Sequence, residues 1–340
     1  MDKRYHRQEL FQQIGVNGQK QLADSHVLIV GVGALGSSSS EMLARAGVGK
    51  LTIADRDYVE LTNLQRQHLF TERDVEEKIP KAIAAKNRLV EINSTIDIDA
   101  IIADIGADEL EELIQQVDLV IDATDNFDTR LVINDLAIKY AVPWIYGGCV
   151  SSYGITFTVI PNKTPCLQCL LEHIPNDGET CDTVGILSPA VQMVVAHQVS
   201  EALKILTGNE EALSKQLIAF DVWKNQTMSI RVDQLKKVDC VTCAKKQYPY
   251  LTYEAKLKTT VLCGRNTVQI RTGNRSTPNF EDLARRLEKT LAHNVSNNNF
   301  LLSFEINSYR IVVFKDGRTF IHGTNNITEA KKLYYGYVSL

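Results

Sequence analysis

The sequence has no long hydrophobic run and no excess of positive charge. No apolar stretch approaches the roughly 18 residues that cross a bilayer, and the opening MDKRYHRQEL has no apolar core of a secretion signal. The formal net charge is -4 at pH 7, which provides no basic field for nucleic acid or for an anionic membrane. We therefore expect a cytoplasmic protein with neither of these partners.

Disulfide bonds are also not expected, although the chain contains 7 cysteines. Cytoplasmic thiols stay mostly reduced, so these cysteines direct attention to metal binding or catalysis. Two C-x-x-C pairs, CLQC (166–169) and CVTC (240–243), suit a tetrahedral zinc site formed by Cys166, Cys169, Cys240 and Cys243. Closing the loop between the pairs costs about 4 kcal/mol, whereas structural zinc contributes about 10–16 kcal/mol in peptides. Redox pairs or incidental thiols are the alternative.

The 340 residues exceed the roughly 250–300 at which single cores stop growing, so we expect one large domain and one small one. Residues 26–55 predict a buried strand, a glycine turn, a helix over 37–46 and a second strand that ends at Asp55. The pattern continues with strands at 96–102, 117–125 and 142–148, and with helices at 80–92 and 129–140. Alternation of this kind predicts a Rossmann-like, doubly wound α/β fold with a mostly parallel sheet and a zinc-bearing extension.

A long helix is predicted over 188–208, with Ser188 as its cap, Pro189 in its first position and Gly208 at its end. Its apolar face suits a core or a subunit contact.

The character of the sequence changes near residue 250. Hairpins are predicted within 260–272 and 309–323, the second turning at Asp316-Gly317. Helices are predicted over 279–292 and 327–337, and residues 295–300 as a loop. We therefore expect a first domain over 1–250 and a small α+β domain over 251–340.

The motif GVGALG has the G-x-G-x-x-G spacing through Gly31, Gly33 and Gly36, and Asp55 follows about 20 residues later. Glycines allow a phosphate to approach the backbone, the helix start offers N–H groups, and the acid can hold a ribose hydroxyl. This predicts an adenine nucleotide site. A tight turn without a ligand is the alternative.

Three further charges distinguish ATP from a nicotinamide cofactor. Arg66 and Lys81 flank the glycine turn from two different elements, and Asp125 follows a buried strand. Two cations and a carboxylate suit a triphosphate with Mg²⁺, because the cations stabilise the departing pyrophosphate and the carboxylate holds the metal. Taken singly, each residue has a plainer interpretation, as a solvated helix charge or, for Asp125, a helix cap.

The remaining cysteines differ in setting. Cys181 lies in the polar loop GETCDTVGILSPAV ahead of the long helix, where an accessible thiol can be activated as a thiolate. Cys149 and Cys263 are predicted to be packed.

Together these motifs resemble the adenylyltransferases that activate ubiquitin-like sulfur-carrier proteins, the MoeB/ThiF/HesA family, which are bacterial relatives of the ubiquitin-activating enzymes. The resemblance covers about residues 1–250. Its motifs are RYHRQ (4–8), GVGALG with AGVGKLTIAD, NLQRQ (63–67), PKA (80–82), TDN (124–126), both cysteine pairs and the cysteine loop before SPAV.

The resemblance implies a reaction in two steps. The C-terminal Gly-Gly carboxylate of a MoaD- or ThiS-type carrier attacks the α-phosphate of ATP, which gives an acyl-adenylate and pyrophosphate. The activated carboxyl then becomes a thiocarboxylate, in molybdopterin or thiamine biosynthesis. The sulfur would come from a separate protein such as a cysteine desulfurase, because residues beyond 250 do not look like the rhodanese domain of some relatives.

The resemblance also implies roles for individual residues. Gly33 would lie against the phosphates, Asp55 on the ribose, and Asp125 on Mg²⁺. Phosphate would be bound by Asn63, Arg66 and Lys81. Arg7 looks like an arginine finger that reaches the ATP of the partner in a homodimer, and Cys181 matches the loop cysteine that some members use covalently.

Two other functions stay open from the sequence. One is a related ATP-dependent enzyme that acts on tRNA-bound threonylcarbamoyladenosine or on a peptide, although the cysteines and the acidic balance argue against the tRNA. The other is an NAD-dependent oxidoreductase, which would leave Arg66 and Lys81 without a purpose.

Overall fold

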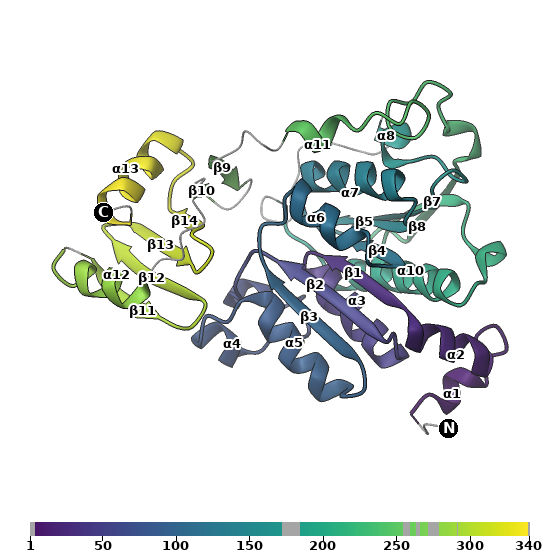
Figure 1. Ribbon diagram of the computed structural model, residues 1–340, viewed down its shortest axis with the longest axis horizontal. Coiled ribbons are helices and arrows are strands. Elements are labelled where there is room, and N and C mark those ends of the chain that lie inside the picture. Colours follow the sequence, from purple (N-terminus) through teal and green to yellow (C-terminus); the bar gives the residue numbers. More distant parts are fainter. Residues whose placement is uncertain are drawn as a thin grey trace. The chain divides into compact units, whose positions relative to one another are not determined.

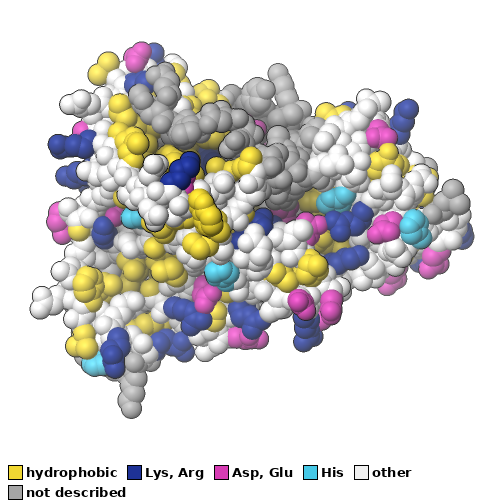
Figure 2. Space-filling view, turned by 180° about the vertical axis from the view of Figure 1, so that it is seen from behind, with side chains coloured by type: hydrophobic (Ala, Val, Ile, Leu, Met, Phe, Trp, Pro, Cys, Tyr) yellow, Lys and Arg dark blue, Asp and Glu magenta, His cyan; other side chains and the backbone are white. Residues whose placement is uncertain are grey.

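The computed structural model describes residues 4–171, 184–253, 259–262, 266–270, 279–290 and 292–338. The chain forms two compact units, Met1–Glu254 and Ala255–Leu340 (Figure 1). On the face that Figure 2 displays, basic and acidic side chains are interspersed, in keeping with the nearly balanced composition. No helix in the described part of the chain is long and apolar enough to cross a membrane.

An 8-stranded sheet in the order β3-β2-β1-β4-β5-β6-β7-β8 runs through the first unit. Its strands are β1 (His26–Val30), β2 (Lys50–Asp55), β3 (Asp97–Ile102), β4 (Leu119–Asp122), β5 (Trp144–Val150), β6 (Tyr153–Val159), β7 (Gln216–Asp221) and β8 (Gln226–Arg231). The first five strands in this order, β3-β2-β1-β4-β5, pair in parallel, whereas β6, β7 and β8 add an antiparallel extension. The predicted α/β fold is confirmed, and the antiparallel extension is an addition to it.

Helices cover both faces of this sheet (Figure 1). One face packs against α6 (Ala107–Ile114) and α7 (Phe127–Tyr140), and the other against α3 (Ala34–Ala46), α5 (Lys81–Ile92) and α10 (Ser188–Leu206). Residues of β1 alternate between the two cores, because neighbouring side chains of a strand point to opposite faces. This explains why the whole strand is apolar in the sequence.

Short elements complete the unit. They are α1 (His6–Glu9), α2 (Gly15–Asp24), η1 (Leu61–Asn63), α4 (Glu72–Glu76), α8 (Leu167–Leu170), η3 (Glu210–Ala212), η4 (Asp233–Leu235) and α11 (Pro249–Tyr253).

Two predicted helix starts are corrected. Helix α3 begins at Ala34, directly after Gly33, so it includes residues that had been assigned to the glycine turn. Ser188 is not a cap but the first residue of α10, and the N-cap position belongs to Leu187. The Ser188 hydroxyl lies instead 3.2 Å from Nε2 of His68, so a tertiary contact replaces the local cap.

The second unit is built on a 6-stranded antiparallel sheet in the order β11-β12-β13-β14-β10-β9. Its elements are β9 (Thr259–Leu262), β10 (Thr267–Ile270), α12 (Phe280–Leu287), β11 (His293–Asn297), β12 (Leu301–Ile306), β13 (Tyr309–Phe314), β14 (Thr319–His322) and α13 (Ile327–Tyr337). Both predicted hairpins are confirmed. One face of the sheet shares an apolar core with the two helices.

The loop predicted at 295–300 is wrong in part, because residues 293–297 form β11. This strand lies at the sheet edge and most of its side chains are exposed, so it lacks the apolar pattern that predicts a strand. The helix predicted to reach residue 292 ends at Leu287.

Candidate active site

The glycine turn lies where the strand order reverses, between the carboxyl ends of β2 and β4. The Gly31 N–H donates to the Ala54 carbonyl at 2.8 Å, and a Cβ on Gly31 would lie 2.6 Å from the Ala123 carbonyl oxygen. Gly31 has φ +90°, which favours glycine. A Cβ on Gly36 would lie only 1.9 Å from the Gly31 oxygen, so both glycines are required by close approach.

The start of α3 can receive an anion. Its N-cap is Gly33, which has no side chain to bind the first N–H groups of the helix. Within the described part of the chain, only the Gln67 side chain, at 3.8 Å, comes within 4 Å of the place where a Cβ on Gly33 would be. This open helix start is suited to a phosphate group.

Asp55 supports the glycine turn from the end of β2. Its carboxylate accepts the Val32 N–H at 2.6 Å and the Asp57 N–H at 2.7 Å. Burial raises the pKa of Asp55, and nearby Lys81 opposes the shift. Each carboxylate oxygen has a second lone pair, so Asp55 can still accept a ribose hydroxyl.

Lys81 is a buried charge and not a solvated one. Its side chain is 4% exposed, and Nζ lies 3.1 Å from Oδ2 of Asp57. The Lys81 backbone N–H also donates to the Asp57 carbonyl at 2.9 Å. The sequence analysis did not identify Asp57, although an acid two residues after Asp55 was a usable signal.

The segment 61–70 folds back on itself beside the glycine turn. Asn63 is buried and accepts the Glu60 N–H at 3.0 Å, and Nη1 of Arg66 donates to the Thr62 carbonyl at 2.9 Å. The Oε1 atom of Gln67 is buried and has no hydrogen-bond partner among the described residues. The segment therefore brings the Gln67 amide close to Gly33, whereas the Arg66 guanidinium forms an exposed hydrogen bond with the Thr62 carbonyl.

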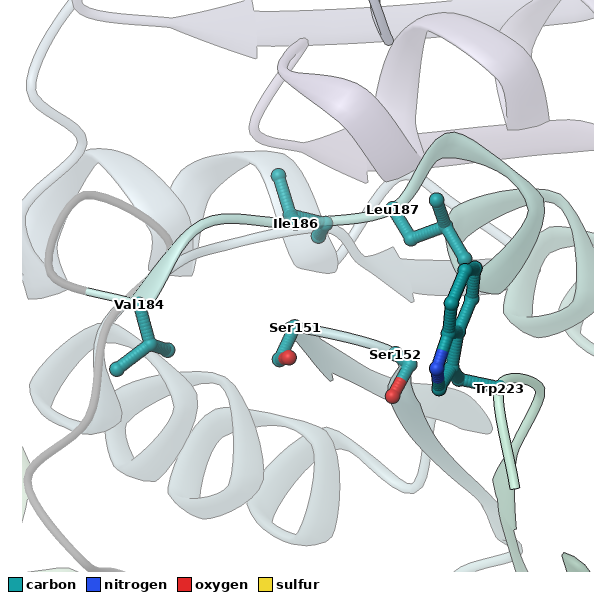
Figure 3. Close-up of a pocket in the computed structure, with 6 residues that line it drawn as sticks. All are labelled: Ser151, Ser152, Val184, Ile186, Leu187 and Trp223. Carbon is teal, nitrogen blue, oxygen red and sulfur yellow. The ribbon is translucent and has the colours of Figure 1, made fainter.

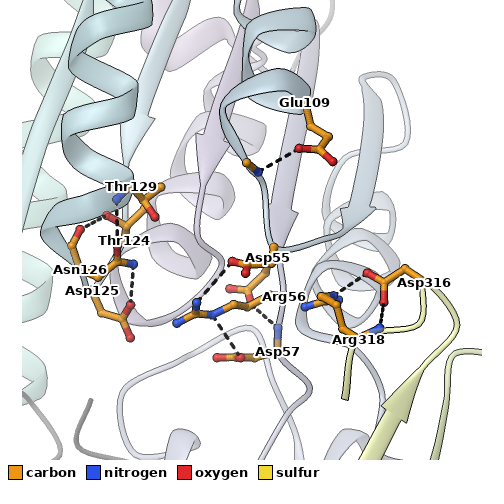
Figure 4. A network of polar contacts seen from close by, with 12 residues as sticks. Asp55, Arg56, Asp57, Glu109, Thr124, Asp125, Asn126, Thr129, Asp316 and Arg318 are labelled. Carbon is orange, nitrogen blue, oxygen red and sulfur yellow. Dashed lines mark hydrogen bonds and ion pairs between the residues drawn. The ribbon is translucent and has the colours of Figure 1, made fainter. Parts of the chain in front are cut away.

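Asp125 lies in the loop between β4 and α7, and its side chain is exposed. The helix cap in this loop is Asn126, whose side chain accepts the Thr129 N–H at 2.9 Å (Figure 4). Strands β2 and β4 pair in parallel with β1 on its two sides. The loop of Asp125 and the loop carrying Asp55 and Asp57 therefore lie at the same end of the sheet, beyond the carboxyl ends of these strands. Since the cap of α7 is Asn126, the plainer interpretation of Asp125 as the helix cap is wrong.

Arg7 is exposed on α1 and lies away from the glycine turn of its own chain. Helix α1 packs at the C-terminal end of α3, where Gln8 Nε2 donates to the Ala46 carbonyl at 2.8 Å. The glycine turn is at the other end of this helix of 13 residues, about 20 Å away. The structure thus does not bring Arg7 to the site of the same subunit.

Cys166, Cys169, Cys240 and Cys243 converge, with all four sulfur atoms within 4.8 Å of one another. The Sγ–Sγ distance is 3.9 Å between Cys166 and Cys169, 3.6 Å between Cys166 and Cys240, and 3.6 Å between Cys169 and Cys243. A tetrahedron with Zn–S bonds of about 2.3 Å has edges of about 3.8 Å, so this donor set fits zinc. A hydrogen bond from Cys166 lowers the pKa of the Cys169 thiol to about 4. The cluster can therefore hold a metal ion.

Helix α7 holds both cysteine turns. Asn134 accepts the Leu167 N–H at 2.8 Å, and Asp135 accepts the Thr242 hydroxyl at 2.8 Å. Cys149 is half-buried against the core, as predicted. Cys181 and Cys263 lie outside the described residues.

A shallow pocket of about 360 Å³ opens beside the β5–β6 turn (Figure 3). It is lined by Ser151, Ser152, Val184, Ile186, Leu187 and Trp223. Ser151 forms a parallel bridge with Ile186, so the chain just before α10 is joined to the end of β5. This pocket could not be predicted from the sequence, because its residues come from three separate segments.

A model of the ThiF family matches residues 5–242. The chain belongs to the ThiF family. A sulfur carrier protein ThiS adenylyltransferase from Bacillus subtilis strain 168 is 49% identical over 338 residues, which are 99% of this chain and 100% of the relative. A molybdopterin-synthase adenylyltransferase from Escherichia coli K12 is 35% identical over 243 residues, 71% of this chain and 96% of the relative. Family membership implies the use of ATP.

Solved structures show the same fold. A crystal structure of Escherichia coli MccB with ATP superposes with a TM-score of 0.62 at 24% identity, over 72% of this chain and 75% of MccB. This similarity shows that the first unit and MccB share a fold.

Proposed function

We propose that the chain is an ATP-dependent adenylyltransferase that activates the C-terminal Gly-Gly carboxylate of a ubiquitin-like sulfur-carrier protein. The observation that carries the proposal is the 49% identity to a ThiS adenylyltransferase over 99% of this chain and 100% of the relative. Because this likeness includes the second unit, we favour a carrier of the ThiS type, used in thiamine biosynthesis, over a MoaD type.

The carrier carboxylate attacks the α-phosphorus, a carbon–oxygen–phosphorus anhydride forms, and the bond to the β-phosphate oxygen breaks. Negative charge therefore moves onto pyrophosphate as it leaves. In our assignment Arg66, Lys81 and Asn63 stabilise that charge, and the open helix start at Gly33 binds the phosphates. Asp55 holds the ribose. The exposed carboxylate of Asp125 fits Mg²⁺, which prefers oxygen ligands and would neutralise phosphate charge.

Asp57 prepares Lys81 for this task. A buried ammonium group needs a charged partner, and the ion pair with Asp57 balances the Lys81 charge and holds the side chain in one place. The Lys81 ammonium group has three donor hydrogens, so it can bind a phosphate oxygen of the triphosphate while it stays paired with Asp57.

The pocket beside the β5–β6 turn supports a path for the carrier tail. Its walls combine the Ser151 and Ser152 hydroxyls with apolar side chains, and exposed Trp223 stands at its rim (Figure 3). Two consecutive glycines have no side chains, so an extended Gly-Gly tail fits a shallow hollow of this kind.

A homodimer would complete the site with an arginine from the partner. Leu10 and Phe11, which lie three and four residues after Arg7, are 64% and 57% exposed and offer apolar surface for a contact between two copies. Burying them between two copies would carry Arg7 toward the nucleotide of the other copy.

The remaining assignments concern the metal and sulfur. We assign structural zinc to the four-cysteine cluster, and we assign Cys181 to the step after adenylation. A separate sulfur donor, such as a cysteine desulfurase, would supply the sulfur.

Carrier-dependent exchange of labelled pyrophosphate into ATP tests the function. We expect exchange with a purified ThiS-type carrier and none when its two terminal glycines are removed. Exchange with a MoaD-type carrier alone would overturn the carrier assignment, and absence of exchange with both would overturn the function.

A further inference from the structure

Directly behind the loop of Asp125 lies a buried ion pair. The Nε atom of Arg130, on α7, is 3.0 Å from Oδ2 of Asp122 at the end of β4, and the two side chains are 9% and 0% exposed. Neither residue was singled out by the sequence analysis. A buried pair of this kind is by itself weak evidence for stability, so its role depends on what else the two side chains contact.

The guanidinium group does more than neutralise Asp122. Its Nη2 atom donates to the Thr124 carbonyl at 2.6 Å and to the Gly147 carbonyl on β5 at 3.0 Å. The rings of Phe127 and Tyr146 lie 5.3 and 5.1 Å from the guanidinium carbon. Arg130 therefore joins the loop after β4 to the neighbouring strand and is itself held by two aromatic side chains.

Asp122 fixes the same loop from its other side. Its Oδ1 atom accepts the Thr124 N–H at 3.0 Å and the Thr124 hydroxyl at 2.7 Å. Its backbone carbonyl accepts Nε2 of Gln198 from α10 at 2.8 Å. The N–H and the carbonyl of Thr124 are thus both bound, one residue before Asp125.

We propose that Arg130 is a positioning residue, which holds the loop 123–126 and thereby aims the Asp125 carboxylate at the reacting nucleotide. The placement of the loop follows from the contacts above, and only the task of Asp125 rests on the proposed function. The planar fork of arginine reaches a carboxylate and two carbonyls at once, which the single ammonium group of lysine does not reproduce.

The test compares three variants with the wild-type protein. Arg130→Lys keeps the charge that Asp122 needs, so the protein should fold. Arg130→Met with Asp122→Asn removes both charges together, which avoids leaving one charge buried alone. Asp135→Asn is the matched control, because Asp135 is a fully buried acid on the same helix that contacts the cysteine turns instead of the loop.

The first readout is amide hydrogen exchange in peptides covering residues 120–130, measured without nucleotide. We expect the Thr124 amide region to exchange at least about tenfold faster in Arg130→Lys and in the double variant, and at the wild-type rate in Asp135→Asn. Unchanged exchange in both Arg130 variants would overturn the proposal, whatever reaction the protein catalyses.

The second readout is pyrophosphate exchange as a function of Mg²⁺ concentration. Misplacing Asp125 should lower the maximal rate of Arg130→Lys by about 100-fold and raise the Mg²⁺ concentration needed for half of that rate. A variant with normal Mg²⁺ dependence would refute the positioning role. If the wild-type protein shows no carrier-dependent exchange, the function fails, and the loop measurement still decides the role of Arg130.

Discussion

At the residue scale, Lys81 and Asp57 illustrate how a charge can be part of the interior. The sequence analysis identified Lys81 through a motif and weighed it against a surface charge, since composition does not report burial. Asp57 itself is visible in the sequence two residues after Asp55, but its pairing with Lys81 was missed, because this pairing forms only when α5 packs beside the end of β2.

Lys81→Ala should reduce pyrophosphate exchange by about 100- to 1000-fold, because the departing pyrophosphate loses a fixed cation. Arg88→Ala, which removes an exposed cation from the same helix, should leave the rate within about twofold. Since Lys81→Ala removes the ammonium group 3.1 Å from buried Asp57 and leaves the more distant Arg56 at 3.9 Å, the double variant with Asp57→Asn should recover stability and stay inactive. Recovery of exchange in that double variant would contradict the role of Lys81.

Asp135 gives a prediction on pH. Burial raises its pKa to about 6 from an ordinary 3.8, although Thr242 and the Tyr250 N–H donate to the carboxylate. A carboxyl with a higher pKa in the folded state contributes stability below pH 3.8, and this contribution is lost as the pH rises through about 6.

The melting temperature of the wild-type protein should therefore fall relative to that of Asp135→Asn as the pH rises from 4 to 7. The variant has no titrating group at this position, and any effect of pH on the cysteine cluster is common to both proteins. A constant difference across this range would show that Asp135 has an ordinary pKa.

At the scale of elements, the glycine turn is the part that the sequence predicted best. Gly31, Gly33, Gly36 and Asp55 all meet at the carboxyl ends of β1 and β2, because the spacing of the motif reflects the geometry of one turn and one helix. Strands β1 to β5 were also predicted. In β1 and β4 burial on both faces makes the strand almost continuously apolar, whereas β3 is an edge strand with exposed aspartates.

Strands β6 and β7 were missed although they are largely buried, and two other missed strands lack a local signal. All six residues of β8 except Ile230 are exposed, and β11 is a polar edge strand, so neither has an apolar period. Arg130 and Asp122 were missed for the same reason, since their joint role arises from contacts among β4, β5 and α7.

Gly36→Ala should destabilise the first unit by about 1–3 kcal/mol or more, because the added methyl group meets the Gly31 carbonyl in rigid backbone. Gly336→Ala is the control. It also lies within a helix, has open space around it, and should stabilise the second unit by about 0.5–1 kcal/mol. Calorimetry measures both changes, and equal effects of the two substitutions would be incompatible with close packing at Gly36.

Removal of the metal should lower the melting temperature of the first unit, because four thiolates would lose the ion that neutralises them. We expect one zinc ion per chain by elemental analysis, reduced in Cys240→Ser and unchanged in Cys149→Ser. An unchanged zinc content in Cys240→Ser would contradict zinc binding by the four cysteines.

At the scale of the whole molecule, the position of Arg7 predicts complementation between subunits. Arg7→Ala and Lys81→Ala should each be inactive as homodimers. Mixed dimers contain one site with an intact lysine and the partner's intact arginine. After unfolding and refolding an equal mixture, exchange should return to about a quarter of the wild-type rate, since half of the dimers are mixed and each has one complete site.

The control for this experiment is a mixture in which one chain carries both substitutions and the other carries Lys81→Ala, where no complete site can form. Full activity of Arg7→Ala by itself would exclude a role for this arginine in either subunit.

The separation of the two cysteine pairs has a consequence for synthesis on the ribosome. Helix α10 and strands β7 and β8 lie between the pairs in the sequence, so the nascent chain exposes Cys166 and Cys169 long before Cys240 and Cys243 leave the exit tunnel. Chains emerge at about 5–20 residues per second, and for several seconds only half of the ligands are available. The parallel strands can therefore associate before all four cysteines are available, and a translational pause after β8 would prolong this stage.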